Sequence, residues 1–366
     1  EVHVLCSRGH YLGDAMDVPA EETHQGVHIH RVRATAFGRG GTLGRLTDYA
    51  SFYTRALAHV LTGPSYDYSV TLTTPPLLPL VGTLAKRLRG QHYGIWSMDL
   101  HPDAEVASGM LDEDGILARG LHALNNAGYR NAEFVVDLGR YMKARITDKG
   151  VAPDKTHTIP VWSRGDEIAP VPHADNPLRN ELGLEDKFVV MYSGNAGMAH
   201  RFDEVLEAMD RLKDHPDIEF VFVGEGPRKE EILQFVNRRG IDNFRYLSYF
   251  PQDQLRYSLS VADVHLLTLQ PNMAGIAVPG KLYGIMAARR PVLMVGPEAS
   301  EPAETIQGAG AGWVVDPTST ADPADALYDR LLQLYDNDNE RVRRGQAGRA
   351  AFVQHFERAV GCEAWE

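Results

Sequence analysis

The 366-residue sequence contains only two cysteines, Cys6 and Cys362, which lie near its opposite ends. This scarcity argues against a disulfide framework and a cysteine-based zinc site, and a reducing cytoplasm is the simplest location. No apolar run approaches the roughly 20 residues that span a bilayer, and no signal peptide is visible. The net charge of −12 argues against a nucleic-acid partner held by general electrostatics.

Several catalytic signatures are also missing. The sequence has no Gly-x-x-x-x-Gly-Lys-Ser/Thr phosphate loop, no serine-nucleophile elbow and no zinc signature. His28 and His30 alternate along a predicted strand at residues 26–31. With only that spacing and no third ligand nearby, we favour a partly exposed strand face over a metal site.

Apolar strands and amphipathic helices alternate regularly in the second half of the chain. Nearly all-apolar strands separated by helices predict a parallel sheet covered on both faces, which is a doubly wound α/β domain. The first half is less regular but similar in kind, and the chain is long enough for two domains. We predict an N-terminal domain at 1–165, a linker rich in turn formers at 166–186, a C-terminal domain at 187–345, and a C-terminal helix at 346–366 that packs back towards the N-terminal domain.

Two loops with glycines follow predicted strands of the second half. In open α/β sheets ligands bind beyond the carboxyl ends of the strands, so two facing sheets would place the site in an interdomain cleft. A close approach of backbone to ligand and a tight turn with a helix cap both explain such glycines. The loops contain Gly194, Asn195, Gly197, Gly224 and Glu225.

Three nearby side chains extend this pattern. Arg201 follows the first loop and would pair with a diphosphate if it points into a cleft, although a solvated surface arginine is an equal alternative. Tyr249 and Phe250 follow the next strand and offer aromatic surface to a nucleobase, whereas ordinary packing explains them equally well.

The stretch at residues 279–293 joins a Pro279-Gly280 turn, Lys281, a short helix and a buried strand. Helix N-termini carry unpaired donors and partial positive charge, so they bind phosphate. A lysine in the first turn is disfavoured by the helix dipole unless an anion answers it. The stretch therefore predicts a phosphate-bearing ligand with Lys281 as its main contact, and a solvated lysine is the alternative.

In the first half, Asp99, His101 and Asp103 follow a predicted strand. Such a set could bind sugar hydroxyls or serve acid–base chemistry. A loop of capping and turn residues is the competing interpretation.

These short motifs occur in the order found in GT-B glycosyltransferases. The sequence resembles the large retaining family 4, and within it bacterial transferases of exopolysaccharide and O-antigen assembly. The resemblance covers nearly the whole chain and rests on residues 66–78, 96–102, 159–163, 192–197 and 278–283.

The resemblance implies two Rossmann-like domains that face a cleft, with the acceptor on the first and the nucleotide sugar on the second. It implies transfer of a sugar with retention of anomeric configuration and without a metal or other cofactor. The donor would be a nucleotide-diphosphate sugar of the UDP or GDP type, and the acceptor a saccharide or a polyprenyl-diphosphate-linked sugar. The expected setting is cell-surface polysaccharide synthesis in the cytoplasm, with peripheral contact to the inner face of the membrane. The family's first strand and glycine loop would precede Glu1.

By the same resemblance, Lys281, Arg201 and the backbone N–H groups near 280–281 would stabilise the leaving diphosphate. Asp99 and His101 are the candidates on the acceptor side. The family commonly carries two glutamates eight positions apart, and Ile276 and Gly284 occupy those positions here. The missing second acid leaves ribose recognition unexplained.

Arg289 also stands where the family commonly has a glycine. The alternatives to a transferase are therefore another GT-B enzyme, such as a sugar-nucleotide epimerase, and an inactive donor-binding or scaffold subunit. The donor-binding residues implied by the resemblance and the loops are Gly194, Asn195, Gly197, Gly224, Glu225, Tyr249, Phe250, Pro279, Gly280, Tyr283 and Gly284.

Overall fold

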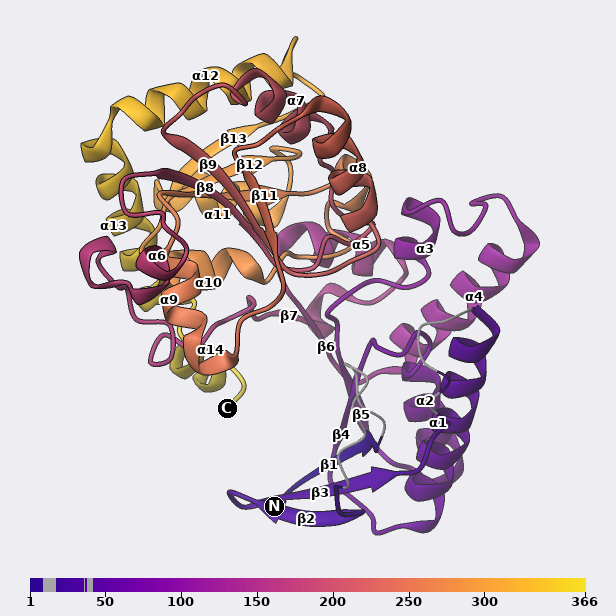
Figure 1. Ribbon diagram of the computed structural model, residues 1–366. Helices are drawn as coiled ribbons and strands as arrows, with labels where there is room; N and C mark the ends of the chain where they lie inside the picture. The colour runs from indigo at the N-terminus through magenta and orange to yellow at the C-terminus, as the bar shows by residue number, and fades with distance from the viewer. Residues whose placement is uncertain (9–17, 36, 38–41) are drawn as a thin grey trace. The chain divides into compact units, whose positions relative to one another are not determined.

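The structure is a computed structural model that describes residues 1–8, 18–35, 37 and 42–366 (Figure 1). Its internal contacts divide the chain into two compact units. Unit 1 comprises Glu1–Pro102, Asp112–Val136 and Ile146–His157, and unit 2 comprises Asp103–Leu111, Asp137–Arg145 and Thr158–Glu366. The domain boundaries expected at 165, 186 and 345 stay predictions.

The strands of unit 1 form two small sheets. In the first, with strand order β1-β3-β2, β1 is parallel and β2 antiparallel to β3. The second, with order β4-β5-β6-β7, belongs mostly to unit 1. The strands are β1 (Val2–Ser7), β2 (Glu21–His24), β3 (Val27–Val32), β4 (Ser69–Leu72), β5 (Tyr93–Trp96), β6 (Val135–Asp137) and β7 (Thr156–Thr158).

Helix α2 (Pro79–Arg89) packs against both α1 (Thr42–Thr62) and α4 (Ile116–Asn131) in unit 1. It begins with a proline, whose missing N–H would be unpaired in a first turn, and it ends at Gly90 in the left-handed conformation with φ of 69°. The buried Tyr93 of β5 links α2 to α4. Its hydroxyl lies 2.8 Å from the Thr83 hydroxyl on α2 and donates to the Gly128 carbonyl on α4 at 2.6 Å. A short 3-10 helix, η2 (Pro153–Lys155), precedes β7.

Unit 2 is built on a six-stranded sheet with strand order β10-β9-β8-β11-β12-β13, and every pair of neighbours is parallel. This confirms the predicted doubly wound domain of the second half. The strands are β8 (Phe188–Ser193), β9 (Ile218–Val223), β10 (Phe244–Leu247), β11 (Val264–Thr268), β12 (Val292–Val295) and β13 (Gly312–Val315).

Alternate residues of β8 enter two different hydrophobic clusters, as expected for a strand buried on both faces. Val190 and Tyr192 pack with α7 (Asp203–Arg211), α8 (Lys229–Arg239) and α12 (Pro323–Asp336). Val189 and Met191 pack in the other cluster, with residues of α6 (Pro177–Glu181) and with the two residues that follow α9 (Leu255–Ser260). Helices therefore cover both faces, and Figure 1 shows α7 beside α12 at the edge of this layer.

The remaining elements of unit 2 complete its outer layers. The C-terminal stretch, which we expected to hold one helix at 346–366, contains α13 and α14, and the Asn337 side chain accepts the Glu340 N–H at 3.0 Å to cap α13. The elements are α3 (Asp103–Ala107), the start of α5 (Arg140–Asp148), η3 (His173–Asp175), η4 (Gln252–Gln254), η5 (Pro271–Met273), α10 (Lys281–Ala287), α11 (Glu301–Ala309), α13 (Asp338–His355) and α14 (Arg358–Glu363).

Arg179 fixes the segment before β8, which the composition assigns to a linker. Its side chain is 2% exposed and donates to the carbonyls of Val261 at 2.6 Å and Leu184 at 2.7 Å. It also forms an ion pair with Asp263 at 3.2 Å, and that carboxylate accepts the Val189 N–H at 2.9 Å. The segment is thus hydrogen-bonded to the start of the central strand.

Cys6 and Cys362 are free thiols. Within residues 1–8, 18–35, 37 and 42–366, no helix combines the length and the apolar character that crossing a membrane requires.

Candidate functional site

The sheet of unit 2 reverses its strand order beside β8. The chain proceeds outward from β8 to β9 and β10, and then returns to place β11 on the other side of β8. Ligands of open parallel sheets bind outside the carboxyl ends of the strands at such a reversal, because the two following loops diverge there. The candidate site is therefore bordered by residues 194–201 after β8 and residues 269–280 after β11.

The glycines of the loops after β8 and β9 are required by the packing of one loop on the other. Gly224 has φ of 138°, and a Cβ atom there would lie 2.2 Å from the Gly194 carbonyl oxygen. Gly226 has φ of 143°, and its Cβ atom would lie 2.5 Å from the Ala196 oxygen. The Ala196 N–H also donates to the Glu225 carbonyl at 2.7 Å. These glycines serve a close turn, and that turn shapes the edge of the site.

Gly194 has a second role, because it leaves room for the side chain of Lys281. It has φ of 138°, and a Cβ atom at this position would lie 2.9 Å from Lys281 Cε. Lys281 begins α10 and reaches across to β8, where its Nζ donates to the Tyr192 hydroxyl at 2.6 Å. Nζ also lies 3.9 Å from the centroid of the Tyr192 ring, which is a cation–π contact.

The charge of Lys281 is not compensated by an acid. Its Nζ contacts the Tyr192 hydroxyl and His200 Nε2, and no carboxylate among the described residues lies within ion-pair distance of Nζ. Burial of the ammonium lowers the pKa of Lys281 to about 7. A buried cation with only neutral partners is suited to receive an anion.

His200 supplies one of these neutral partners. Its Nδ1 lies 2.6 Å from the Thr268 carbonyl oxygen, so Nδ1 carries the proton and Nε2 presents a lone pair to Lys281 Nζ at 3.4 Å. Burial, and then the charge of Lys281, lower the pKa of His200 to about 3. Tyr192 is the other neutral partner, because burial raises the pKa of its hydroxyl. This hydroxyl donates to the Asn195 carbonyl at 2.9 Å.

Two arginines near the site already have carboxylate partners. Arg201 Nε donates to Glu204 at 2.8 Å, and a second guanidinium nitrogen pairs with the other oxygen of Glu204. Arg228 makes two hydrogen bonds to Glu231, at 2.9 and 2.7 Å, and donates to the His200 carbonyl at 2.7 Å. Neither arginine matches the uncompensated state of Lys281.

The other residues predicted for the donor side separate into exposed and packed groups. Asn195 and Gly280 are exposed, and Tyr249 is 48% exposed with its ring beside Gly224. Pro279 and Gly197 are half-buried in the turns that flank them. The Glu225 carboxylate forms an ion pair with Lys229 Nζ at 2.9 Å.

Three further predicted residues are part of the packing. Tyr283 is 1% exposed, and its ring centroid lies 4.8 Å from that of Phe356. Phe250 packs against the second hydrophobic cluster of the sheet. Gly284 is buried, and a Cβ atom there would lie 3.5 Å from Leu259. Their role as ligand contacts stays a prediction.

Asp99 and His101 belong to unit 1. The Asp99 N–H donates to the Thr73 hydroxyl at 3.1 Å, and the His101 carbonyl accepts from Asn125 Nδ2 at 2.6 Å. Their loop is therefore fixed through its backbone. The predicted roles of the two side chains on the acceptor side stay predictions.

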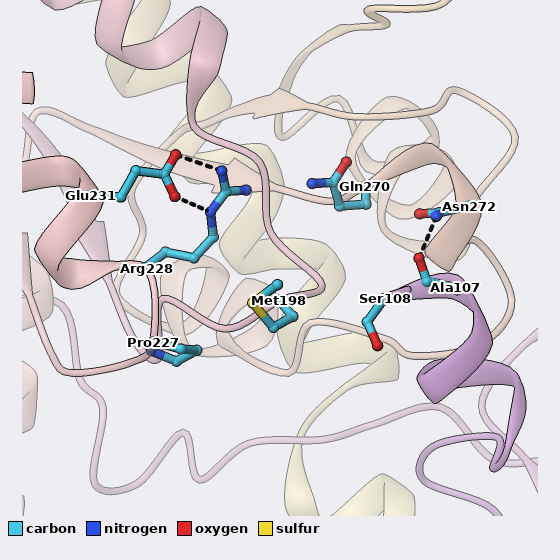
Figure 2. Close-up of a pocket in the computed structure, with 8 residues that line it drawn as sticks. All are labelled: Ala107, Ser108, Met198, Pro227, Arg228, Glu231, Gln270 and Asn272. Atoms are coloured by element: carbon cyan, nitrogen blue, oxygen red, sulfur yellow. Dashed lines mark hydrogen bonds and ion pairs between the residues drawn. The ribbon is translucent and has the colours of Figure 1, made fainter. Parts of the chain in front are cut away.

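A cavity of about 350 Å³ opens in unit 2 beside the same glycine loops (Figure 2). The Arg228–Glu231 pair forms one wall, while the Asn272 amide donates to the Ala107 carbonyl at 2.6 Å on the opposite side. Arg228 joins the cavity to the Lys281 environment through its hydrogen bond to the His200 carbonyl. The lining residues are Ala107, Ser108, Met198, Pro227, Arg228, Glu231, Gln270 and Asn272.

Comparisons with known proteins agree with this architecture. Residues 175–351 match the family model of the glycosyl transferases group 1, and residues 1–162 match that of the glycosyl transferase 4-like domain. Both parts of the chain therefore match models of glycosyltransferase families, and the fold is that of the GT-B glycosyltransferases. The fold class predicted from the sequence is confirmed.

The individual relatives are bacterial. The chain is 29% identical over 268 residues to the probable glycosyltransferase WbjE of Pseudomonas aeruginosa, a match of 73% of this chain and 66% of that protein. It is 30% identical over 253 residues to the putative colanic acid biosynthesis glycosyl transferase WcaI of Escherichia coli K12, covering 67% of this chain and 62% of that protein. The chain thus spans slightly less than two thirds of the length of these two relatives.

A solved structure shares the fold over most of the chain. The Anabaena protein Alr3699/HepE, in complex with UDP-glucose, matches with a TM-score of 0.70 at 15% identity, covering 92% of this chain and 84% of that one. At this identity the likeness shows the fold alone.

Proposed function

We propose that this chain transfers a sugar from a nucleotide-diphosphate sugar to a saccharide or lipid-linked acceptor in the synthesis of cell-surface polysaccharide, with retention of configuration and without a catalytic metal. One observation carries the proposal: the uncompensated ammonium of Lys281 at the strand reversal of unit 2. A diphosphate is the anion that fits a cation held between a glycine loop and a helix start. The relationship to WbjE and WcaI supports the reaction class and the pathway.

In this proposal Lys281 acts on the leaving group. Negative charge develops on the departing diphosphate, and a preorganised ammonium stabilises it more strongly in the transition state than in the ground state. Removing one such donor typically lowers the rate by about 10²–10³. A phosphate oxygen of the leaving group would accept the acceptor's hydroxyl proton on the same face of the sugar, so retention needs no protein nucleophile.

The donor's nucleoside would be recognised mainly through its base. Tyr249 offers an exposed ring beside Gly224 at the sheet edge. No acidic side chain stands at the two positions where the family has glutamates, because Ile276 is an apolar residue that is 2% exposed and Gly284 has no side chain. We therefore propose that base stacking and the diphosphate supply most of the affinity, with UDP favoured by the UDP-glucose complex of the Anabaena neighbour.

His200 and Tyr192 would act as positioning residues for Lys281. The Thr268 carbonyl fixes the histidine tautomer, so the ring can only accept from the ammonium and cannot repel it with a second proton. The Tyr192 hydroxyl donates to the Asn195 carbonyl and accepts from Lys281. These two contacts orient Nζ before the donor binds.

The cavity beside the glycine loops would hold a sugar ring. Its volume of about 350 Å³ accommodates a monosaccharide, and Gln270, Asn272 and Glu231 can exchange hydrogen bonds with hydroxyl groups. Met198 and Pro227 offer apolar surface for the C–H face of the ring.

A nucleotide panel tests the proposal. Thermal melts with UDP, GDP, ADP and TDP should show stabilisation by one of them, about 2.7 kcal/mol at 100 times its dissociation constant. Lys281→Ala should remove the response to that nucleotide while the protein stays folded. If no nucleotide raises the melting temperature, the donor site is wrong.

Turnover separates a transferase from a donor-binding scaffold. Incubation with the matching nucleotide sugars should release free nucleotide slowly without an acceptor and faster with one. Tight binding with no release and no transfer to any saccharide acceptor would identify a scaffold. Formation of an epimerised nucleotide sugar would identify the other GT-B reaction.

A further inference from the structure

Three histidines stand on one face of the first sheet of unit 1. β1 and β3 run parallel, and their register places His3 opposite His28. The two rings stack with centroids 4.7 Å apart and planes 21° from parallel, and the ring of His30 lies 5.3 Å from that of His3. The strand pairing thus supplies the further ligand that the spacing of His28 and His30 alone does not reveal.

A carboxylate lies at the exposed end of this row. Glu1 Oε1 is 2.7 Å from His28 Nε2 and 3.6 Å from His3 Nε2. One ligating atom from each of Glu1, His3 and His28 can be chosen so that all three lie within 4.8 Å of one another. Two imidazole nitrogens and a carboxylate oxygen therefore converge on one point.

The opposite nitrogen of each ring has its own partner. His3 Nδ1 lies 3.0 Å from His30 Nε2, and His28 Nδ1 lies 3.1 Å from the Thr23 hydroxyl. Metal-binding histidines show this arrangement, in which one nitrogen ligates and the other is held by a hydrogen bond that fixes the ring orientation. The Nε2 atoms of His3 and His28 face the Glu1 carboxylate, and His28 Nε2–H donates to it, so a bound ion would take the place of that proton.

We propose that Glu1, His3 and His28 bind one divalent transition-metal cation of the Zn²⁺ type. Imidazole and carboxylate are the ligands of such an ion, at about 2.0–2.2 Å, with water in the fourth position of a tetrahedral site. Ligand atoms of that geometry stand about 3.3 Å apart. The two contacts of Glu1, at 2.7 and 3.6 Å, therefore need shifts of under about an ångström, and the distance between the two histidines, which is at most 4.8 Å, must close by at most about 1.5 Å. The site can do so because the three side chains are 67%, 23% and 36% exposed, in the order Glu1, His3 and His28.

Binding would fasten β1 to β3 by a link between their side chains. All three ligands belong to unit 1, whereas Lys281 and the loops around it belong to unit 2. The ion is therefore proposed as a structural clip and takes no part in sugar transfer. Its presence or absence can be measured independently of the proposed donor site.

Metal titration of the full chain tests this assignment. Zn²⁺ added to the metal-free protein at pH 7.5 should bind with one-to-one stoichiometry by calorimetry, and Co²⁺ should give the visible absorption of a tetrahedral site. His28→Ala and His3→Ala should each weaken Zn²⁺ binding about tenfold or more, the lower end of what second-shell changes alone produce. Zn²⁺ should also raise the melting temperature of the wild type and not of these variants.

A matched control and a surface variant keep the test decisive. His24 is an exposed histidine on β2 of the same sheet, and His24→Ala should bind Zn²⁺ like the wild type. Glu1→Gln changes an exposed side chain that the fold does not need, so its expected loss of affinity cannot be ascribed to unfolding. The proposal is overturned if the wild type does not bind Zn²⁺ at micromolar concentrations. It is also overturned if His24→Ala weakens binding as much as His28→Ala, or if Glu1→Gln and His28→Ala both retain full affinity.

Discussion

Replacing Lys281 with methionine should stabilise the protein while it removes nucleotide binding. Methionine keeps an unbranched chain of similar length but carries no charge into the space beside Tyr192 and Gly194. The variant therefore separates the cost of burying the ammonium from the packing of the side chain. A residue selected for binding an anion is expected to lower stability in the free protein.

The magnitude follows from the pKa of Lys281. Burial lowers it from 10.5 to about 7, and at 1.36 kcal/mol per pKa unit this corresponds to at most about 5 kcal/mol of unfavourable free energy in the charged folded state. The side chain is only half-buried, and its cation–π contact with Tyr192 returns part of that cost. We expect Lys281→Met to raise the free energy of unfolding of unit 2 by about 1–2 kcal/mol at pH 6.

The advantage of the variant should depend on pH with a definite sign. Below pH 7 the lysine is protonated in both the folded and the unfolded protein, so the folded wild type carries the full cost. Between pH 7 and 10.5 the unfolded chain holds a proton that the folded protein has lost, so the stability of the wild type rises with pH across this window. The difference between variant and wild type should shrink from pH 6 to pH 9.

Urea unfolding at pH 6, 7.5 and 9 measures this difference, and the transition that the nucleotide identified by thermal melts shifts in the wild type reports on unit 2. Lys213→Met is the matched control, because Lys213 pairs with Asp210 at 3.1 Å and should change stability by less than about 0.5 kcal/mol. The reasoning is refuted if Lys281→Met is no more stable than the wild type at pH 6. An advantage that stays constant up to pH 9 would likewise show that the ammonium is not desolvated.

Three further predictions address the neighbours of Lys281 and the fold. His200→Gln keeps an acceptor near Lys281 and should retain most of the UDP affinity, whereas His200→Leu should lose about tenfold or more by calorimetry; equal affinities would remove His200 from the site. Met198→Trp should fill the cavity and lower the rate of transfer to acceptor with UDP affinity unchanged, and an unaltered rate would exclude a sugar there. Arg179→Met should lower the free energy of unfolding by about 3–5 kcal/mol in urea, since it removes the buried guanidinium's bonds to the Val261 and Leu184 carbonyls and its ion pair with Asp263. A loss below 1 kcal/mol would contradict that account.

The alternation of strands and helices made the fold of unit 2 predictable. Strands such as β8 and β9 are apolar at nearly every position, Ser193 and Glu219 excepted, because helices cover both faces, and such runs are recognisable in the sequence. Two short strands at sheet edges escaped prediction. β2 and β7 are four and three residues long and lie at sheet edges, where local sequence carries little pattern. The separation of α13 from α14 near Phe356 was also not visible in composition.

The site was predictable only where its residues adjoin a recognisable turn. Lys281 stands after Pro279-Gly280 and was predicted as a phosphate contact for that reason. Its partners were missed, because His200 is 81 residues and Tyr192 is 89 residues away in the chain, and only the sheet brings them together. Arg201 shows the opposite case: Glu204 follows it at the i+3 spacing that forms ion pairs, so the sequence already held the reason why this arginine is compensated.

The position of the Lys281 ammonium depends on a series of packing contacts that begins at the backbone of two glycines. Gly224 lacks a Cβ atom and so admits the Gly194 carbonyl, and Gly194 lacks one and so admits Lys281. The lysine then meets His200, whose ring must stay neutral, because a second buried cation 3.4 Å away would expel the first. The Thr268 carbonyl secures that neutrality by holding the proton on Nδ1. The position of the Lys281 charge therefore depends on the two glycines and on the proton that His200 Nδ1 keeps. An anionic ligand would balance this charge.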